Sequence, residues 1–189
     1  MLTLSDAQER LLPLVGKTYQ CPKTANKGAV GLLLEDILGV PHGPRCLDCE
    51  DGELKVFPLK ANSNGDLVPK ETIAVTMLTP TSVVAEPFAA SRAFKKLEKT
   101  LYVPYLRTED TIVFMKPCLM EASNPAMSKV YETFAEDYES IRANLVGGGV
   151  PSSSMGKYLQ NRTKGAGGDA PKTRAFYLRT GFIREFIMS

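Results

Sequence analysis

The residues with the clearest chemical potential lie in the stretch DCEDGELKVFPLK, which runs from Asp48 to Lys60. Four of its first six residues are acidic, and Lys55 follows them inside an apolar run. Alternate residues of a strand share one face, so Glu53 and Lys55 should point the same way. Asp48 precedes them on a turn, from which its carboxylate can converge on theirs. Because hard divalent cations take oxygen ligands, this pattern predicts a Mg²⁺ site beside an ammonium group.

This combination of groups suits the hydrolysis of a phosphodiester. A bound Mg²⁺ polarises a phosphoryl oxygen and activates water, while a neighbouring lysine orients the water or offsets developing charge. The alternative is structural, with solvated acids at the start of a strand and a lysine whose aliphatic stem covers apolar surface. Glu35 favours the catalytic interpretation, because it lies on a predicted buried helix where a carboxylate needs a partner.

The elements that must position these groups follow from hydrophobic periodicity. A helix is expected at about residues 27–38, ended by Gly39, and a strand at 53–59. Ser5 and Gln8 form a capping-box pattern for an N-terminal helix. The apolar stripe in residues 126–145 predicts a long helix that packs into the core. Further strands or helices are expected at 70–78, 91–99, 101–106, 111–119 and 173–180.

Composition limits the class of protein. The chain has 189 residues, of which 43% are hydrophobic, so it can form a core of its own. Its net charge of +2 says nothing by itself about nucleic acid. Basic residues are nevertheless concentrated after Met155, where they outnumber the acids Asp169 and Glu185. This segment is a candidate phosphate-facing surface or, alternatively, an ordinary solvated face. Its basic residues are Lys157, Arg162, Lys164, Lys172, Arg174, Arg179 and Arg184.

Other classes are disfavoured. There is no leader pattern and no apolar run near the ~20 residues of a membrane span, so we expect an intracellular, soluble protein without a membrane partner. Cys46 and Cys49 form a single CxxC without the second pair that a zinc site requires. The one histidine, His42, has no serine near it in sequence, which argues against triad chemistry.

Five segments, in order, resemble the MutH mismatch-repair endonucleases and the related type II restriction enzymes that cut GATC. The resemblance covers roughly residues 27–186 and implies an α/β fold with a restriction-endonuclease-like core, in which a mixed β-sheet is flanked by helices. The segments are NKGAVGLLLEDILGV with GELKVFPL, KETIAVTMLTP, SRAFKKLEKTLYVPY, GKYLQNRTKG and TRAFYLRTGF.

The resemblance implies the roles of the acidic cluster. Glu35, Asp48, Glu53 and Lys55 would form the catalytic set, with the three carboxylates holding Mg²⁺ and Mn²⁺ able to substitute for it. The MutH proteins place the aspartate farther from the Glu-x-Lys pair, at a spacing that falls on a cysteine here. We therefore assign the aspartate role to Asp48, and Asp51 is its rival.

The resemblance also implies the residues that bind DNA. Lys27 would lie close to the active site, and Arg162, Thr163 and Lys164 would lie on a loop that reads bases in the major groove. The MutH pattern has a proline where this chain has Thr163. Tyr177 would sense the adenine of GATC and its methylation, or be a strand tyrosine half in the core. Two further arginines would hold phosphates: Arg174 and Arg179.

Together these observations predict a Mg²⁺-dependent, sequence-specific endonuclease acting on double-stranded DNA. One form is a type II restriction enzyme that cuts both strands at GATC, alone or as a transient homodimer. Another is a MutH-like nickase of unmethylated GATC, activated by a MutL-like partner. A third, of a different class, is a DNA-binding protein that does not cut. We expect one domain over residues 1–189 with two lobes, a catalytic core of about 1–146 and recognition segments in 150–189, hinged at Gly147–Gly149.

Overall fold

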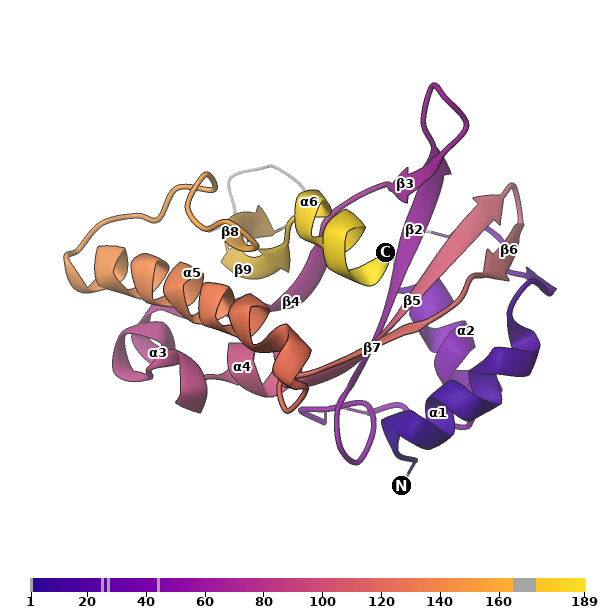
Figure 1. Cartoon of the computed structure of the whole chain (residues 1–189), viewed down its shortest axis with the longest axis horizontal. Coiled ribbons are helices and arrows are strands. Elements are labelled where there is room, and N and C mark those ends of the chain that lie inside the picture. Colours follow the sequence, from indigo (N-terminus) through magenta and orange to yellow (C-terminus); the bar gives the residue numbers. More distant parts are fainter. Residues whose placement is uncertain (1, 25, 27, 44, 165–172) are drawn as a thin grey trace. The chain divides into compact units, whose positions relative to one another are not determined.

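A computed structural model, shown in Figure 1, describes all residues except 1, 25, 27, 44 and 165–172. The chain forms two compact units, each built from separate segments. The first unit comprises residues 1–71, 99–120 and 187–189, and the second comprises 72–98 and 121–186. Residues Gly147–Gly149 lie inside the second unit, so the chain does not pass from one unit to the other there. The second unit also includes residues 72–98 and 121–146, which cluster with the C-terminal segment. The assignment of catalysis and recognition to two lobes stays a prediction.

The first unit contains the larger sheet. Its strand order is β1-β6-β5-β2-β3, and β7 also pairs with β5. β2 and β5 run parallel, whereas β2–β3, β5–β6 and β1–β6 are antiparallel, so the sheet is mixed. The strands are β1 (Thr18–Gln20), β2 (Glu53–Ala61), β3 (Leu67–Pro69), β5 (Lys99–Thr108), β6 (Thr111–Phe114) and β7 (Cys118–Glu121).

Two helices, α1 (Leu4–Leu11) and α2 (Ala29–Leu38), pack side by side against this sheet (Figure 1), and η1 (Leu12–Leu14) follows the first. Their apolar side chains share one core with the strands, including Leu34, Leu54 and Leu101. Gly39 ends α2 in the left-handed conformation at φ 73°, as predicted. The predicted cap of the first helix is wrong: Thr3, not Ser5, caps it, and Asp6 completes the capping box.

The second unit contains an antiparallel sheet of order β4-β9-β8 and the remaining helices. The long helix packs its apolar stripe into this unit, where Tyr138 stacks on Phe176 with ring centroids 5.3 Å apart. The predicted core role of the stripe is thus confirmed. The elements are β4 (Ile73–Leu78), α3 (Pro80–Ala85), η2 (Phe88–Ala90), α4 (Arg92–Leu97), η3 (Pro125–Met127), α5 (Ser128–Val146), β8 (Leu159–Lys164), β9 (Thr173–Leu178), α6 (Thr180–Phe182) and η4 (Ile183–Ile187).

The predicted α/β class, with a mixed sheet flanked by helices, is confirmed. In the described part of the chain, no helix combines the length and apolar character needed to cross a bilayer.

Candidate active site

The start of β2 places Glu53 and Lys55 on one face of the larger sheet. They pair in register with Thr100 and Tyr102 of the parallel strand β5. Lys55 Nζ donates a hydrogen bond to Glu53 Oε1 at 2.5 Å. Glu53 is only 1% exposed and Lys55 is 26% exposed, so the pair joins a buried carboxylate to an ammonium group that solvent can reach. The predicted common face of the two side chains is confirmed.

The loop before β2 lies tightly against its neighbours. A Cβ atom at Gly52 would come within 2.4 Å of both Lys99 O and Leu4 Cδ1, so only glycine fits there. Asp51 fixes the same loop, since its Oδ1 accepts the Leu4 N–H at 2.7 Å and its Oδ2 accepts Lys99 Nζ at 2.6 Å. Burial alone would raise the pKa of Asp51, but these bonds and the lysine charge lower it on balance. Both oxygens of Asp51 therefore have structural partners.

Asp48 is the better candidate for a metal ligand. Its Oδ2 accepts the Leu54 N–H at 3.1 Å, which holds the carboxylate beside the start of β2. The buried thiol of Cys49 lies among the acids: burial first, and then the charges of Asp48, Asp51 and Glu53, raise its pKa to about 11. The charges of all three carboxylates thus act on the Cys49 thiol, and two of the carboxylates, Asp51 and Glu53, already pair with Lys99 and Lys55.

Glu35, on α2, lies near the same cluster. Burial first, and then the charge of Asp48, raise its pKa, and Lys55 partly offsets this effect. Its side chain is 22% exposed. His42 was not predicted as part of the site, yet its Nε2 lies 3.4 Å from Glu35 Oε2 and 3.2 Å from Asp36 Oδ1. The sequence feature that points to this contact is Gly39, because its left-handed conformation turns the chain back toward the end of α2.

The side chains that the structure describes do not by themselves complete a metal site. In the described ranges, no three His, Cys, Asp or Glu side chains are placed to hold a metal together, and this includes the predicted set of Glu35, Asp48 and Glu53. Mg²⁺, however, is usually held by one or two carboxylates together with water and substrate phosphates. Asp48 and Glu53 suit a site of this kind, which substrate would complete.

The second unit holds the predicted base-reading residues, and they lie on a strand rather than on the predicted loop. Arg162, Thr163 and Lys164 form the exposed end of β8. Arg162 Nη1 donates to Thr72 Oγ1 at 3.0 Å, and its guanidinium carbon lies 5.8 Å from the centre of the Tyr177 ring. These two side chains therefore share one face of the smaller sheet.

The two arginines predicted to hold phosphates donate to this unit's own backbone. Arg174 Nη1 donates to Pro151 O at 2.8 Å and also to Asn161 Oδ1. Arg179 donates to the carbonyls of Gly156, Ser153 and Met155 at 2.9, 2.8 and 3.0 Å. Both guanidinium groups thus order the segment 151–156. Their contacts with phosphate stay a prediction, and Lys27 lies outside the described residues.

Asp137, which the sequence did not single out, anchors the strand that carries Arg162. Its Oδ1 accepts the Lys157 N–H at 2.6 Å, and its Oδ2 accepts those of Tyr158 and Leu159 at 2.7 Å each. The carboxylate is buried on α5. It satisfies three backbone donors at once and so fixes the start of β8 against α5.

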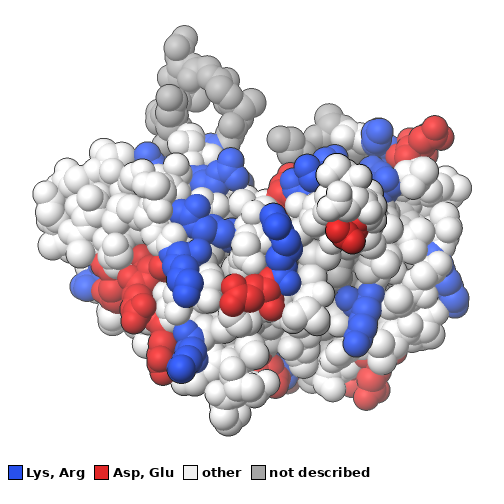
Figure 2. Space-filling model, turned by 45° about the horizontal axis from the view of Figure 1, so that its top comes forward, with Lys and Arg blue, Asp and Glu red and all other residues white. Residues whose placement is uncertain are grey.

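On the face seen in Figure 2, the distribution of charge does not single out a DNA-binding site. On the side seen in Figure 2, Lys and Arg side chains form several clusters with Asp and Glu side chains between them. The local contacts of the predicted DNA-binding residues are therefore a better guide than the surface charge.

The family profile described as "MutH: DNA mismatch repair enzyme MutH" matches residues 47–137. The matched range contains Asp48, Glu53 and Lys55 but neither Glu35 nor the strands β8 and β9. The sequence has no significant match among curated proteins. Among solved structures, it is similar to one described as "Restriction endonuclease MvaI-cognate DNA substrate complex". That similarity has 12% sequence identity and a TM-score of 0.49, over 97% of this chain and 96% of the other.

Proposed function

We propose that this chain, whose residues 47–137 match the MutH family profile, is a metal-dependent DNA endonuclease. The observation that carries the proposal is the pair of Glu53 and Lys55, joined at 2.5 Å, with the carboxylate of Asp48 beside them. Asp48, Glu53 and Lys55 all lie in the matched range, and the charge of Glu35 acts on the same cluster. A buried carboxylate paired to a reachable lysine, amid further acids, is the environment expected of a reacting site.

The reaction would add water to a backbone phosphorus and break one P–O ester bond, which leaves a phosphomonoester and a hydroxyl group. When bound, Mg²⁺ supplies polarisation of the phosphoryl oxygen. Asp48 and Glu53 would offer it their oxygens, with Glu35 contributing charge from α2. Lys55 Nζ would donate to the attacking water or to a phosphoryl oxygen, where it offsets the negative charge that builds up.

The finer part of the proposal concerns the sequence that is cut. Exposed Arg162 and half-buried Tyr177 share one face of the smaller sheet, and a guanidinium group can donate two hydrogen bonds to guanine O6 and N7. We assign base reading to Arg162 with Lys164, and adenine sensing to Tyr177. GATC is the candidate site.

Digestion of a supercoiled plasmid that carries GATC tests the proposal. Wild type should cut it with Mg²⁺ or Mn²⁺ but only bind it with Ca²⁺. Glu53→Gln and Lys55→Ala should each lose at least ~100-fold in cleavage rate, because each removes a group that acts on the reacting phosphate. Binding in Ca²⁺, measured by fluorescence anisotropy, should survive. Lys17→Ala, which removes an exposed lysine elsewhere in the first unit, is the matched control and should cut normally.

Two results would contradict the proposal. Full cleavage by Lys55→Ala would remove the lysine from the reaction. Sequence-specific binding by wild type without cleavage in any divalent ion would instead support the non-cleaving DNA-binding protein.

Repair nicking is the second candidate activity, because the matched family is described as a mismatch-repair enzyme. The restriction alternative predicts linear product from a plasmid with one site, by one chain or a transient homodimer. The repair alternative predicts nicked circles, only from unmethylated DNA, and faster nicking with a MutL-like activator. Comparing methylated and unmethylated one-site plasmids separates the two.

A further inference from the structure

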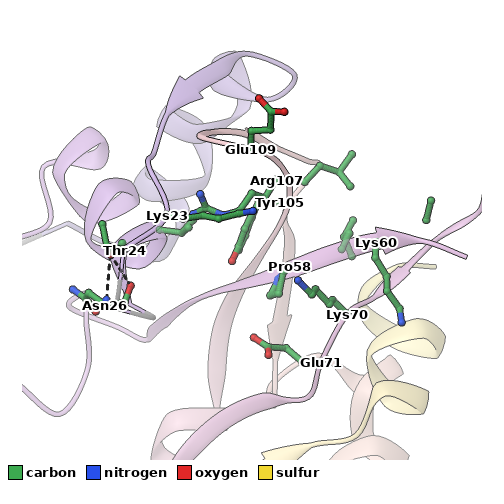
Figure 3. A pocket seen from close by; sticks show the side chains of 15 residues that line it. Lys23, Thr24, Asn26, Pro58, Lys60, Lys70, Glu71, Tyr105, Arg107 and Glu109 are labelled. Atoms are coloured by element: carbon green, nitrogen blue, oxygen red, sulfur yellow. Dashed lines mark hydrogen bonds between the residues drawn. The ribbon is translucent and has the colours of Figure 1, made fainter.

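The first unit has a cavity of about 620 Å³ that none of the assigned residues lines. Figure 3 shows Lys23, Thr24 and Asn26 on one side of it and Lys60, Lys70 and Glu71 on the other. With Arg107 and Glu109 included, the lining contains four basic and two acidic side chains. The cavity therefore has a net positive lining and would attract an anion.

Three of the four cations are available to a ligand. Within the described ranges, Lys23, Lys60 and Lys70 make no ion pair, and all three are exposed. Arg107 differs, because its guanidinium donates to Cys21 O and, at 3.3 Å, to Cys21 Sγ. It contributes charge rather than a free donor. The lysine ammonium groups are thus the groups that a bound anion would contact.

The walls of the cavity belong to the elements that carry the candidate active site. Residues Pro58 to Ala61 continue the strand of Glu53 and Lys55, and Ala29 and Val30 begin the helix of Glu35. From Lys55 to Lys60, β2 advances about 16 Å at roughly 3.3 Å per residue. That length corresponds to about five base-pair steps of B-DNA at 3.4 Å each.

The lining fits an extended anion better than an enclosed small molecule. Small-molecule sites are mostly apolar and bury most of their ligand, whereas the lysine and glutamate side chains that line this cavity are exposed and form its rim. Tyr105 adds no negative charge, because burial raises its pKa and the charge of Arg107 offsets this only in part. Phosphate groups of a backbone that passes over the rim would meet the lysines without being buried.

We propose that this cavity binds a backbone phosphate of duplex DNA several base pairs from the cleaved bond, through Lys23 and Lys70. The inference rests on the proposed function, since it assigns another part of the same DNA. It assigns a phosphate contact to the first unit, in addition to those predicted for the basic C-terminal segment of the chain.

Salt-dependent binding of a fluorescein-labelled duplex with one central GATC, measured in Ca²⁺, tests the proposal. Lys23→Ala and Lys70→Ala should each weaken binding several-fold and lower the slope of log K against log salt by about 1, as loss of one phosphate contact does. Glu71→Gln should tighten binding, because it removes a repelling charge from the rim. Lys17→Ala has the same charge change outside the cavity and should match wild type.

The outcomes separate this inference from the function on which it rests. If wild type cuts DNA but Lys23→Ala and Lys70→Ala bind it like Lys17→Ala, the cavity is not a DNA contact and the nuclease proposal stands. If wild type neither binds nor cuts duplex, both proposals fail. Lysine-dependent binding of inorganic phosphate or a mononucleotide, with duplex binding unchanged in the variants, would make the cavity a small-anion site and overturn the assignment. Thermal melting of each variant confirms that it is folded.

Discussion

At the scale of single residues, Glu35 is a carboxylate that the fold holds in an unfavourable setting. Burial and the charge of Asp48 raise its pKa. A carboxyl whose pKa is raised on folding stabilises the protein below its unfolded pKa, and this contribution is lost as the pH rises through the folded pKa. Above its folded pKa, where Glu35 is ionised, the group therefore costs stability. A divalent cation beside it would relieve that cost.

We expect Glu35→Gln to melt at the same or a higher temperature than wild type at neutral pH, because the disfavoured charge is gone. The advantage should vanish in acid, where Glu35 itself is protonated. Cleavage in Mg²⁺ should fall. Melting curves over a pH series, with the exposed α1 residue Glu9→Gln as control, check this. A lower melting temperature at neutral pH would make the Glu35 carboxylate a stabilising group.

Residue types and spacing predicted the centre of the site but not its surroundings. Glu53 and Lys55 could be predicted because strand alternation places them together wherever β2 lies. The choice between Asp48 and Asp51 as the metal ligand could not be made from the sequence. It depends on the hydrogen bonds of Asp51 to Leu4 and Lys99, which join segments far apart in the chain. His42 was missed for a similar reason, because its contact depends on how the chain turns after α2.

At the scale of elements, the buried carboxylate of Asp137 holds β8 to α5. We expect Asp137→Asn to destabilise the protein by about 2–3 kcal/mol, because the amide nitrogen cannot accept the backbone N–H groups that the carboxylate oxygens accept. Urea unfolding measures the change. Glu136→Gln, at the exposed neighbouring position of α5, should leave stability unchanged. Equal stability of Asp137→Asn and wild type would show that water satisfies those donors equally well.

The exposed end of β8 leads to a separate prediction about how the protein discriminates between DNA sequences. Arg162→Ala should lose ~1–3 kcal/mol of discrimination between GATC and a duplex with one changed base pair. Lys23→Ala, which removes a proposed phosphate contact, should instead weaken binding to both duplexes alike and lower the salt slope by about 1. Competition binding in Ca²⁺ distinguishes the two. Equal weakening on all sequences by Arg162→Ala would make that arginine a phosphate contact.

The strong periodicity of apolar residues made helices α2 and α5 easy to predict, whereas the polar strand β8 was harder to predict. The stripe on α5 and the apolar surface of α2 repeat at helical spacing, and both helices lie where expected. β8 ends in Asn161, Arg162, Thr163 and Lys164, whose polar side chains favour a loop assignment. Its pairing with β9 makes it a strand, and this pairing is a tertiary effect that overrides local preference.

At the scale of the whole molecule, the chain alternates between two cores. β4 pairs with β9, so Ile73 lies opposite Leu178 although the two are far apart in sequence. No local pattern indicates such a pairing. The division into two units follows such contacts between distant segments, and the predicted catalytic and recognition lobes stay a prediction.

Removal of residues 147–189 tests the predicted two-lobe boundary. The truncation takes away β8 and β9, leaves β4 without a strand partner and exposes Tyr138, which stacks on Phe176. We expect residues 1–146 to aggregate or to bind a hydrophobic dye, as measured by light scattering and dye fluorescence. A monomeric fragment with cooperative unfolding would support a catalytic core that folds without the C-terminal segment.

The separation of the two cores has a practical consequence for engineering. The residues assigned to chemistry belong to one core, and Arg162, Lys164 and Tyr177 belong to the other. Substitutions at positions that share no interaction partners usually have additive effects on stability. A library that randomises the exposed positions of β8 and β9 could therefore be selected for altered target preference while the machinery that breaks the bond keeps its native sequence.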